Sequence, residues 1–206
     1  MAVGSEERKR LEEIHEINRR FLELIALHTD RERVGRYGLP ADLCERIRAL
    51  GASQRDVLAS VPLLLVTATR RAVEQAGKVH DMENNRSRTY DKNEVAEQIF
   101  TVALMTWLTQ DAQQHHSLAS LWLGTERGEG EPLSELNFGD IQHLAAYADM
   151  ILGARFADRP KVWFDLIRAA ESDDPRRHQL ARLAVLPHSY PVTKRARPGA
   201  GRRRKR

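Results

Sequence analysis

Apolar residues recur at steps of three and four along most of this 206-residue chain, and that spacing constrains the fold more than any other feature. The clearest case runs from residue 5 to residue 27, where one helical face collects Leu11, Ile14, Ile17, Phe21, Leu24, Ile25 and Leu27. Strict two-residue alternation is nearly absent, and only residues 63–69 (LLLVTAT) could form a strand instead. The sequence therefore predicts an all-α fold, a compact helical bundle.

Residues 41–59 carry the pattern of a helix-turn-helix. A helix over 41–50 is expected to end at Gly51 in the left-handed conformation, and Ser53 is expected to cap the helix that follows. The candidate DNA contacts of this unit are its three arginines, Arg46, Arg48 and Arg55. Arg55 falls in the first turn of the second helix, the part of such a motif that reads the major groove. An ordinary pair of packed helices has the same pattern, and the arginines would then be a solvated face.

Further helices are expected over residues 30–37 and 94–122. Asp140 is expected to cap a helix that continues to residue 151, Pro160 to begin the next, and Asp173-Asp174-Pro175 to open a last helix over 176–186. A polar stretch before residue 94 divides the chain. The predicted organisation is an N-terminal helical unit (5–80), a polar linker (81–93), a C-terminal helical unit (94–187) and a flexible basic tail (188–206).

The two halves align with each other at an offset of 86 residues. Few aligned residues are identical, among them Leu22 with Leu108 and Leu58 with Leu144. The order of features is shared: a long amphipathic helix, a glycine break, a short helix, a capped helix and an apolar run. This order fits a tandem duplication in which each unit buries the apolar face of the other, although chance could produce as many identities.

The motifs of the second half resemble those of the FlhD subunit of the flagellar master transcription activator. The matching residues are Gln110-Asp111, Leu123-Gly124, Leu133 and Leu136, Leu144-Ala145, and Arg155-Phe156 with Asp158. The first half resembles the same pattern in EINRRFLELIALHTDRERVGRYGL and IRALGASQRDVLA. Together the two stretches cover about two-thirds of the chain. The resemblance implies two FlhD-like helical hairpin units in tandem.

The same resemblance implies a transcription activator that acts as a homo-oligomer or with a companion regulator subunit and contacts RNA polymerase. The companion FlhC subunit carries a four-cysteine zinc site, which cannot be carried over because Cys44 is the one cysteine here. The loop TERGEGEP is also longer than the FlhD pattern allows, and this chain is nearly twice the length of an FlhD subunit. Relatives encoded on conjugative and integrative mobile elements switch on transfer genes, and a duplicated member fits that setting better than flagellar control.

Charge is distributed unevenly. The formal net charge is +4, yet residues 194–206 hold eight basic side chains and no acid, so the rest of the chain carries about −4. Those eight are Lys194, Arg195, Arg197, Arg202, Arg203, Arg204, Lys205 and Arg206. A flexible arm of this kind neutralises phosphates and gives DNA affinity without sequence choice. Arg70, Arg71 and Lys78 form a second, weaker basic cluster. The alternative is a solvated tail that only aids solubility.

Catalytic and metal-binding motifs are missing from the sequence: it has no phosphate-binding glycine loop, no HExxH and no GxSxG. His115 and His116 are adjacent, and neighbouring helix residues point about 100° apart, which does not suit a shared metal. We therefore expect no enzyme, no cofactor and no metal. The charged start MAVGSEERKRLEE and the lack of an apolar run that could cross a bilayer predict a cytoplasmic protein without a membrane partner.

These features predict a DNA-binding transcriptional regulator whose partner is double-stranded DNA. The alternative is a non-enzymatic helical protein-interaction module, or an accessory factor for replication or transfer of a mobile genetic element. In that case Trp107, Trp122 and Trp163, which otherwise fit a core or subunit interface, would form the binding surface. An RNA binder would share the basic tail but lacks the usual recognition modules.

Overall fold

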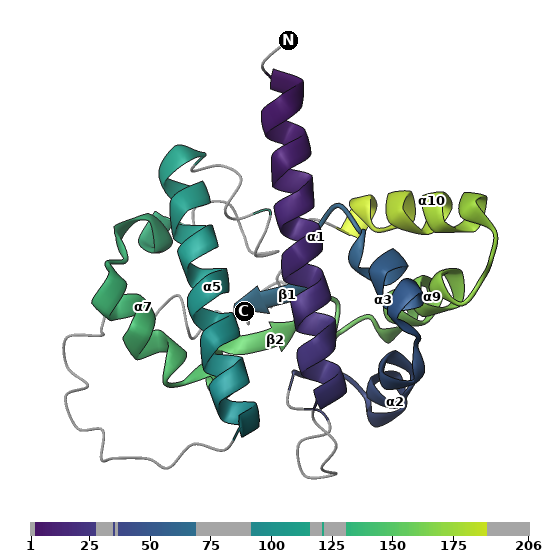
Figure 1. Cartoon of the computed structure of the whole chain (residues 1–206), viewed down its shortest axis with the longest axis horizontal. Helices are drawn as coiled ribbons and strands as arrows, with labels where there is room; N and C mark the ends of the chain where they lie inside the picture. Colours follow the sequence, from purple (N-terminus) through teal and green to yellow (C-terminus); the bar gives the residue numbers. More distant parts are fainter. Residues whose placement is uncertain are drawn as a thin grey trace, which may run out of the picture.

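The computed structural model describes residues 3–27, 35, 37–68, 92–115, 121 and 131–188. The described chain is mostly helical, as the apolar spacing predicts (Figure 1). Its α-helices are α1 (Val3–Leu27), α2 (Ala41–Ala49), α3 (Ala52–Ala59), α5 (Lys92–Gln114), α7 (Phe138–Ala145), α8 (Ala148–Ile151), α9 (Pro160–Ala170) and α10 (Pro175–Ala184). None of these helices is long and apolar enough to cross a membrane.

Two 3-10 helices and two short strands complete the described part. The 3-10 helices are η3 (Glu131–Glu135) and η4 (Leu186–His188), and the strands are β1 (Val66–Ala68) and β2 (Leu152–Ala154). The one stretch that could have been a strand, 63–69, does contain β1. Several predictions lie outside the described residues: most of the helix over 30–37, nearly all of the linker over 81–93, Arg70, Arg71, Lys78, His116, Trp122 and the tail from residue 189 onward.

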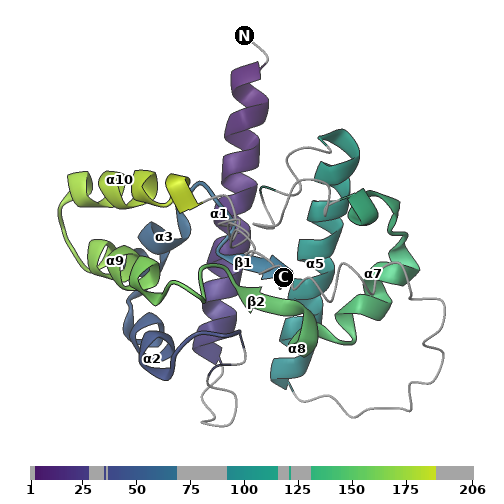
Figure 2. The same cartoon turned by 180° about the vertical axis from the view of Figure 1, so that it is seen from behind.

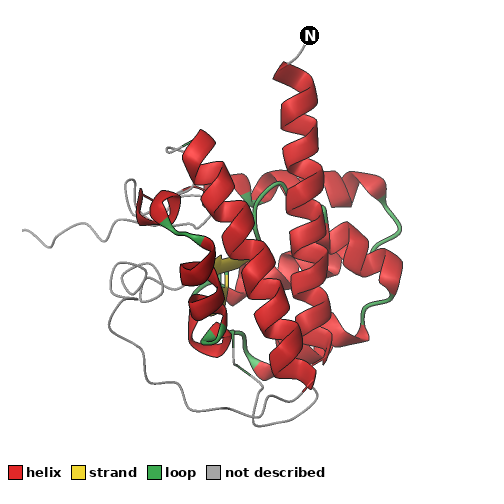
Figure 3. Ribbon diagram, turned by 60° about the vertical axis from the view of Figure 1, so that its left-hand side comes forward, coloured by secondary structure: helices red, strands yellow, loops and turns green. Residues whose placement is uncertain are grey.

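The long helices α1 and α5 lie side by side and run antiparallel through the middle of the molecule (Figure 3). Near the start of α1, Arg10 Nε lies 3.1 Å from Asp111 Oδ1 near the end of α5. Closer to the other end, the rings of Phe21 and Phe100 stack with centroids 5.9 Å apart. One continuous hydrophobic core includes both helices and reaches α2, α3, α7, α9 and both strands.

Elements of the two halves correspond at the 86-residue offset. Adding 86 to the bounds of α3 gives the bounds of α7, and adding 86 to β1 gives β2. The strands pair antiparallel with Thr67 opposite Gly153, which are themselves 86 residues apart, while Val66 faces Ala154 and Ala68 faces Leu152. A two-fold axis through the central pair produces this register, and it also accounts for the antiparallel α1 and α5. The backbone therefore supports a duplication that residue identities alone left open.

The repeats differ between the short helix and the strand. In the first repeat residues 60–65 form no helix, and the fully buried Asn18 of α1 satisfies their backbone groups. Its Nδ2 donates to the carbonyl oxygens of Ala59 at 3.0 Å and Leu63 at 2.8 Å, and its Oδ1 accepts from the Leu65 N–H at 2.7 Å.

The equivalent stretch of the second repeat satisfies its own backbone. Residues 146–151 form a turn and helix α8, in which the N–H groups of Met150 and Ile151 donate to the Tyr147 carbonyl. Since a helical turn supplies these hydrogen bonds internally, no side chain is needed there. The residue equivalent to Asn18 is Leu104, an apolar and buried side chain.

Helices α9 and α10 follow β2, and they fold back on the first repeat (Figure 2). α9 packs against α2 and α3, and α10 packs on α9. α9 begins at Pro160 as predicted. Asp174 caps α10 through an Oδ1 that accepts from the Arg176 N–H at 2.9 Å, which confirms that start too. Trp163 of α9 is fully buried, and its Nε1–H donates to the Arg155 carbonyl at 2.7 Å.

Two predicted caps of the helix-turn-helix were wrong. Gly51 has φ −68° and ψ 167°, an extended conformation rather than a left-handed one. It occupies the N-cap position of α3, which begins one residue later, so Ser53 is not the cap. Only two residues connect the helices: Leu50 is the C-cap of α2 and Gly51 is the N-cap of α3, so no residue is left for a left-handed glycine after the C-cap. A positive φ of 79° lies at Gly38, before α2.

The helix expected from Asp140 to residue 151 also differs. Its cap is Asn137, whose Oδ1 accepts from the Asp140 N–H at 3.1 Å, while the Asp140 carboxylate accepts from the Asn137 N–H at 2.9 Å. This reciprocal pair is a capping box, in which the acid stands three residues inside the helix. The predicted single helix is divided into α7 and α8 by a turn at Ala146 and Tyr147.

Candidate nucleic-acid interface

Arg46 is engaged within the fold. Its Nη2 lies 3.0 and 2.8 Å from the two carboxylate oxygens of Glu171, just after α9. Its guanidinium also lies over the Phe164 ring, 5.7 Å from the centroid. An arginine held by a carboxylate and an aromatic face stabilises a helix contact, so Arg46 joins α2 to α9.

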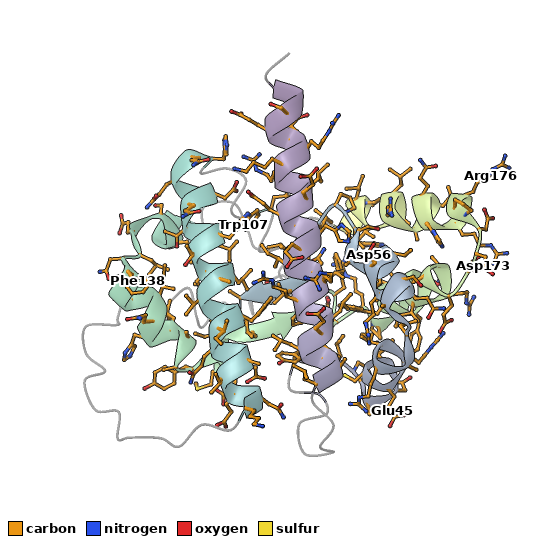
Figure 4. The ribbon with its side chains drawn as sticks, in the orientation of Figure 1. Glu45, Asp56, Trp107, Phe138, Asp173 and Arg176 are labelled. Atoms are coloured by element: carbon orange, nitrogen blue, oxygen red, sulfur yellow. The ribbon has the colours of Figure 1, made fainter. Side chains whose placement is uncertain are left out.

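Arg48 and Arg55 are both half-buried. Arg48 lies near Cys44, and burial raises the pKa of the Cys44 thiol, which keeps it protonated at neutral pH. Arg55 lies in the first turns of α3, beside the exposed Asp56, whose Oδ1 is 3.0 Å from His15 Nε2 (Figure 4). α1 and α9 flank α3, and the exposed residues of this helix are Ala52, Ser53 and Asp56. The roles of all three arginines as DNA contacts stay predictions.

The Arg155-Phe156 motif lies inside the fold. Arg155 is buried, and its guanidinium lies 5.2 Å from the Phe156 ring centroid. The backbone N–H of Arg155 donates to the Leu65 carbonyl at 2.8 Å. Burial lowers the pKa of Arg155 to about 10, so the side chain is charged at neutral pH. The motif joins β2 to the first repeat and to Trp163, and it is a structural element of the core rather than a surface site.

Four exposed basic side chains of the last two helices were missed by the sequence reasoning. They lie on α9 and α10 and are Lys161, Arg168, Arg176 and Arg177. The adjacent Arg176 and Arg177 could have indicated a basic surface. They were passed over because Asp173 and Asp174, directly before them, give this stretch of sequence no net charge. Figure 4 shows Arg176 pointing away from the body at the far end of α10. The described chain ends four residues after α10, at His188, and the predicted phosphate-binding segment 194–206 follows.

The two sides of the molecule differ in charge. Residues 155–188, which contain α9 and α10, hold seven basic and five acidic side chains, a net charge of +2. Residues 131–154, which contain η3, α7 and α8, hold four acids and no Lys or Arg, a net charge of −4. α10 and α7 lie on opposite sides of α1 (Figure 1). The segment that contains α9 and α10 is therefore more positive than the segment that contains α7 and α8.

A polar cavity of about 420 Å³ opens between the start of α1 and the end of α5. Its lining includes the Arg10–Asp111 pair and Lys9, whose Nζ lies 3.8 Å from Glu13 Oε1. These charges neutralise one another. Across the described ranges, no three side chains of His, Cys, Asp or Glu come together in a way that could hold a metal ion.

Comparison with known proteins gives no match to a family model, to a curated protein or to a solved structure.

Proposed function

We propose that this chain is a DNA-binding transcriptional regulator, an activator that works as an oligomer or with a companion subunit. One observation carries the proposal: eight basic residues and no acid in segment 194–206, attached to a body of net negative charge. Basic segments of this kind commonly bind polyanions such as nucleic acid. Each arginine or lysine that neutralises a phosphate releases counterions, which supplies affinity for duplex DNA of any sequence.

The charge distribution of the described chain also favours contact of DNA with the α9–α10 side. The described chain ends four residues after α10, and α9 and α10 expose Lys161, Arg168, Arg176 and Arg177. We expect DNA held by the basic segment to contact these side chains in preference to the acidic α7 side, because opposite charges attract. Sequence choice then comes from Arg55 at the exposed start of α3, from a companion subunit, or from DNA shape. An activator of this kind also contacts RNA polymerase.

The test is the salt dependence of binding to a duplex DNA fragment, measured by fluorescence anisotropy. The full chain is compared with a variant that lacks residues 194–206. The full chain should lose affinity steeply with salt, and the truncated chain should bind more weakly with a slope of log K against log salt that is shallower by up to about 7. Equal affinities at every salt concentration would rule out this role for the segment.

A scrambled segment is the matched control. A chain in which residues 194–206 keep their composition but not their order should bind like the full chain, because phosphate contacts do not depend on order. Replacing the same eight basic residues by Gln should reproduce the truncation. A scrambled segment that fails to bind would mean that the order of residues is read, which a purely electrostatic contact does not explain.

A second candidate function is a non-enzymatic interaction or accessory factor for a mobile genetic element. Exposed apolar side chains on α7 and α10, Phe138, Leu180 and Leu183 among them, favour a protein partner. A stable complex with a partner protein that ignores DNA would select this alternative.

A further inference from the structure

Helix α5 exposes apolar side chains along one face. Ile99 is 63% exposed, Val95 is 41% exposed, and the small Ala103 one turn later is exposed as well. These three residues are spaced four apart, so they form one row along the helix, the α5 stripe. α5 has no charged side chain between Glu97 and Asp111. A surface helix normally turns charged and polar side chains to water, and the α5 stripe departs from that pattern.

The equivalent face of α1 is charged. At the 86-residue offset Val95 corresponds to Lys9 and Ile99 corresponds to Glu13. α1 and α5 lie in front of both strands in Figure 1, and no described element covers them from that side. The shared repeat plan therefore does not require the apolar residues of α5. We interpret the α5 stripe as a surface for contact with another chain.

An apolar groove of about 470 Å³ lies between α1 and α5, beside the α5 stripe. Phe100 and Leu104 of α5 and Ile17 of α1 line it, and all three are buried. Trp107 lies between the two helices (Figure 4), and its Nε1–H donates to Glu13 Oε2 at 2.9 Å, which orients the indole. Exposed charged side chains of α1 also line the groove, Glu12 and Arg20 among them. An apolar centre with a polar rim is the arrangement found in protein–protein interfaces.

The α5 stripe and the groove fit each other. Ile99 is an exposed, branched apolar side chain, and the groove is large enough to hold it. Both features lie on one face of the molecule, because Ala103 belongs to the stripe and also lines the groove. A face with a protruding apolar side chain next to an apolar groove is self-complementary, which a two-fold contact requires.

The face is also large enough for a stable contact. α5 has 23 residues. Two such helices side by side therefore present about 35 Å by about 20 Å, or roughly 700 Å². A standard interface buries about 800 Å² on each partner.

We propose that two copies of this chain form a dimer through this face, with the two α5 helices antiparallel. The two-fold axis passes close to Ala103, whose small side chain lets the helices approach closely. Ile99 lies four residues before the axis and Trp107 four residues after it, so Ile99 of each copy enters the groove beside Trp107 of the other. The inference specifies the oligomer named in the proposed function, but the association needs no DNA, so the two can fail separately.

The first test is sedimentation equilibrium of the full chain without DNA. The wild type should be a concentration-dependent dimer. Ile99→Asp should weaken dimerisation about tenfold or more, because it places a carboxylate in an apolar groove. Leu180→Asp is the matched control and should leave the dimer unchanged, since Leu180 is 67% exposed on α10, away from α5 (Figure 1). Thermal denaturation followed by circular dichroism checks that both variants keep the fold.

Cysteine cross-linking tests the position and direction of the two helices. Cys44 is the one cysteine of the chain, so Cys44→Ala is the background. Ala103→Cys should then form a disulfide-linked dimer on mild oxidation, because residues at the axis face their own copies within the roughly 7 Å that a disulfide allows between Cα atoms. Ile99→Cys is the control on the same stripe and should not cross-link, because it lies about 12 Å from its own copy along an antiparallel pair. Non-reducing gel electrophoresis measures both.

Several results would overturn the inference. One is a wild type that is monomeric at every soluble concentration; if that monomer still binds DNA through segment 194–206, the proposed function stands alone. Others are a dimer that Ile99→Asp weakens no more than Leu180→Asp does, a failure of Ala103→Cys to cross-link, or cross-linking at both positions, which indicates parallel helices. If Ile99→Asp lowers the melting temperature without changing association, another part of the same chain covers the groove, and the inference is again wrong.

Discussion

The two repeats share one backbone plan but have different surroundings. In the first repeat α9 covers α2 and α3, Trp163 is buried and Arg46 pairs with Glu171. In the second repeat residues 131–154 contain no Lys or Arg, and Met150 is 45% exposed whereas its equivalent, Leu64, is fully buried. The comparison teaches that a duplicated unit need not use both copies alike, because the added helices bury one copy while the other presents an acidic, partly apolar surface.

The largest expected effect on stability is at helix α9, which packs on α2 and α3. Trp163→Ala removes a fully buried side chain and its hydrogen bond to the Arg155 carbonyl, and should lower the free energy of unfolding by about 3–5 kcal/mol. Phe138→Ala, at an exposed position of the second repeat, should change the free energy of unfolding by no more than about 0.5 kcal/mol. Urea denaturation measures both. A loss for Phe138→Ala as large as that for Trp163→Ala would mean that Phe138 is buried rather than exposed.

A second prediction concerns the residue that differs at the α1–α5 core. Asn18→Leu gives the first repeat the residue that the second repeat has, at Leu104. The Leu63 carbonyl and the Leu65 N–H then lose their partner, and a buried unsatisfied group costs about 1–3 kcal/mol. We expect a loss of about 2–4 kcal/mol in urea denaturation. A variant as stable as wild type would show that residues 60–65 satisfy their backbone without Asn18.

Much of this fold was open to prediction from local sequence. The three- and four-residue spacing predicted α1 and α5, although α5 ends at Gln114 and the predicted helix ran to residue 122. Pro160 and Asp174 marked the starts of α9 and α10, because a proline and a capping carboxylate act within one turn. The pairing of β1 with β2 could not be predicted locally, since its partners lie 86 residues apart. The correspondence of the two halves was equally hard to predict, because many apolar residues fit the same buried position.

The candidate interface was predictable only in part. Segment 194–206 could be identified by counting charges, which needs no structure. Arg46 could not be separated from the other arginines by sequence, because its partner Glu171 lies 125 residues away. Arg176 and Arg177 were passed over because the neighbouring aspartates balance them in sequence, whereas in the structure Asp174 caps the helix and both arginines are exposed.

A smaller effect is expected where α9 meets α2. Arg46→Ala breaks the pair with Glu171 and the contact with Phe164, but the carboxylate is exposed and the arginine half-exposed. Surface pairs and cation–π contacts at such sites are worth about 0.5–1 kcal/mol. Thermal denaturation of Arg46→Ala and Arg46→Lys measures the loss, and Lys should recover little of it because it lacks the planar group. A loss near that of Trp163→Ala would mean that Arg46 is a principal contributor to the packing of α9 on α2.

The most direct measurement places DNA on one side of the molecule. Two double variants each lower the net charge by two at exposed positions. The arginine variant is Arg176→Gln with Arg177→Gln, in α10. The glutamate variant is Gln110→Glu with Gln142→Glu, in α5 and α7. The account predicts that the arginine variant binds duplex DNA more weakly, with a salt slope shallower by about 2. The glutamate variant should keep the wild-type slope. If both variants behave alike, or only the glutamate variant loses affinity, DNA is not bound at the α9–α10 side and the account is contradicted.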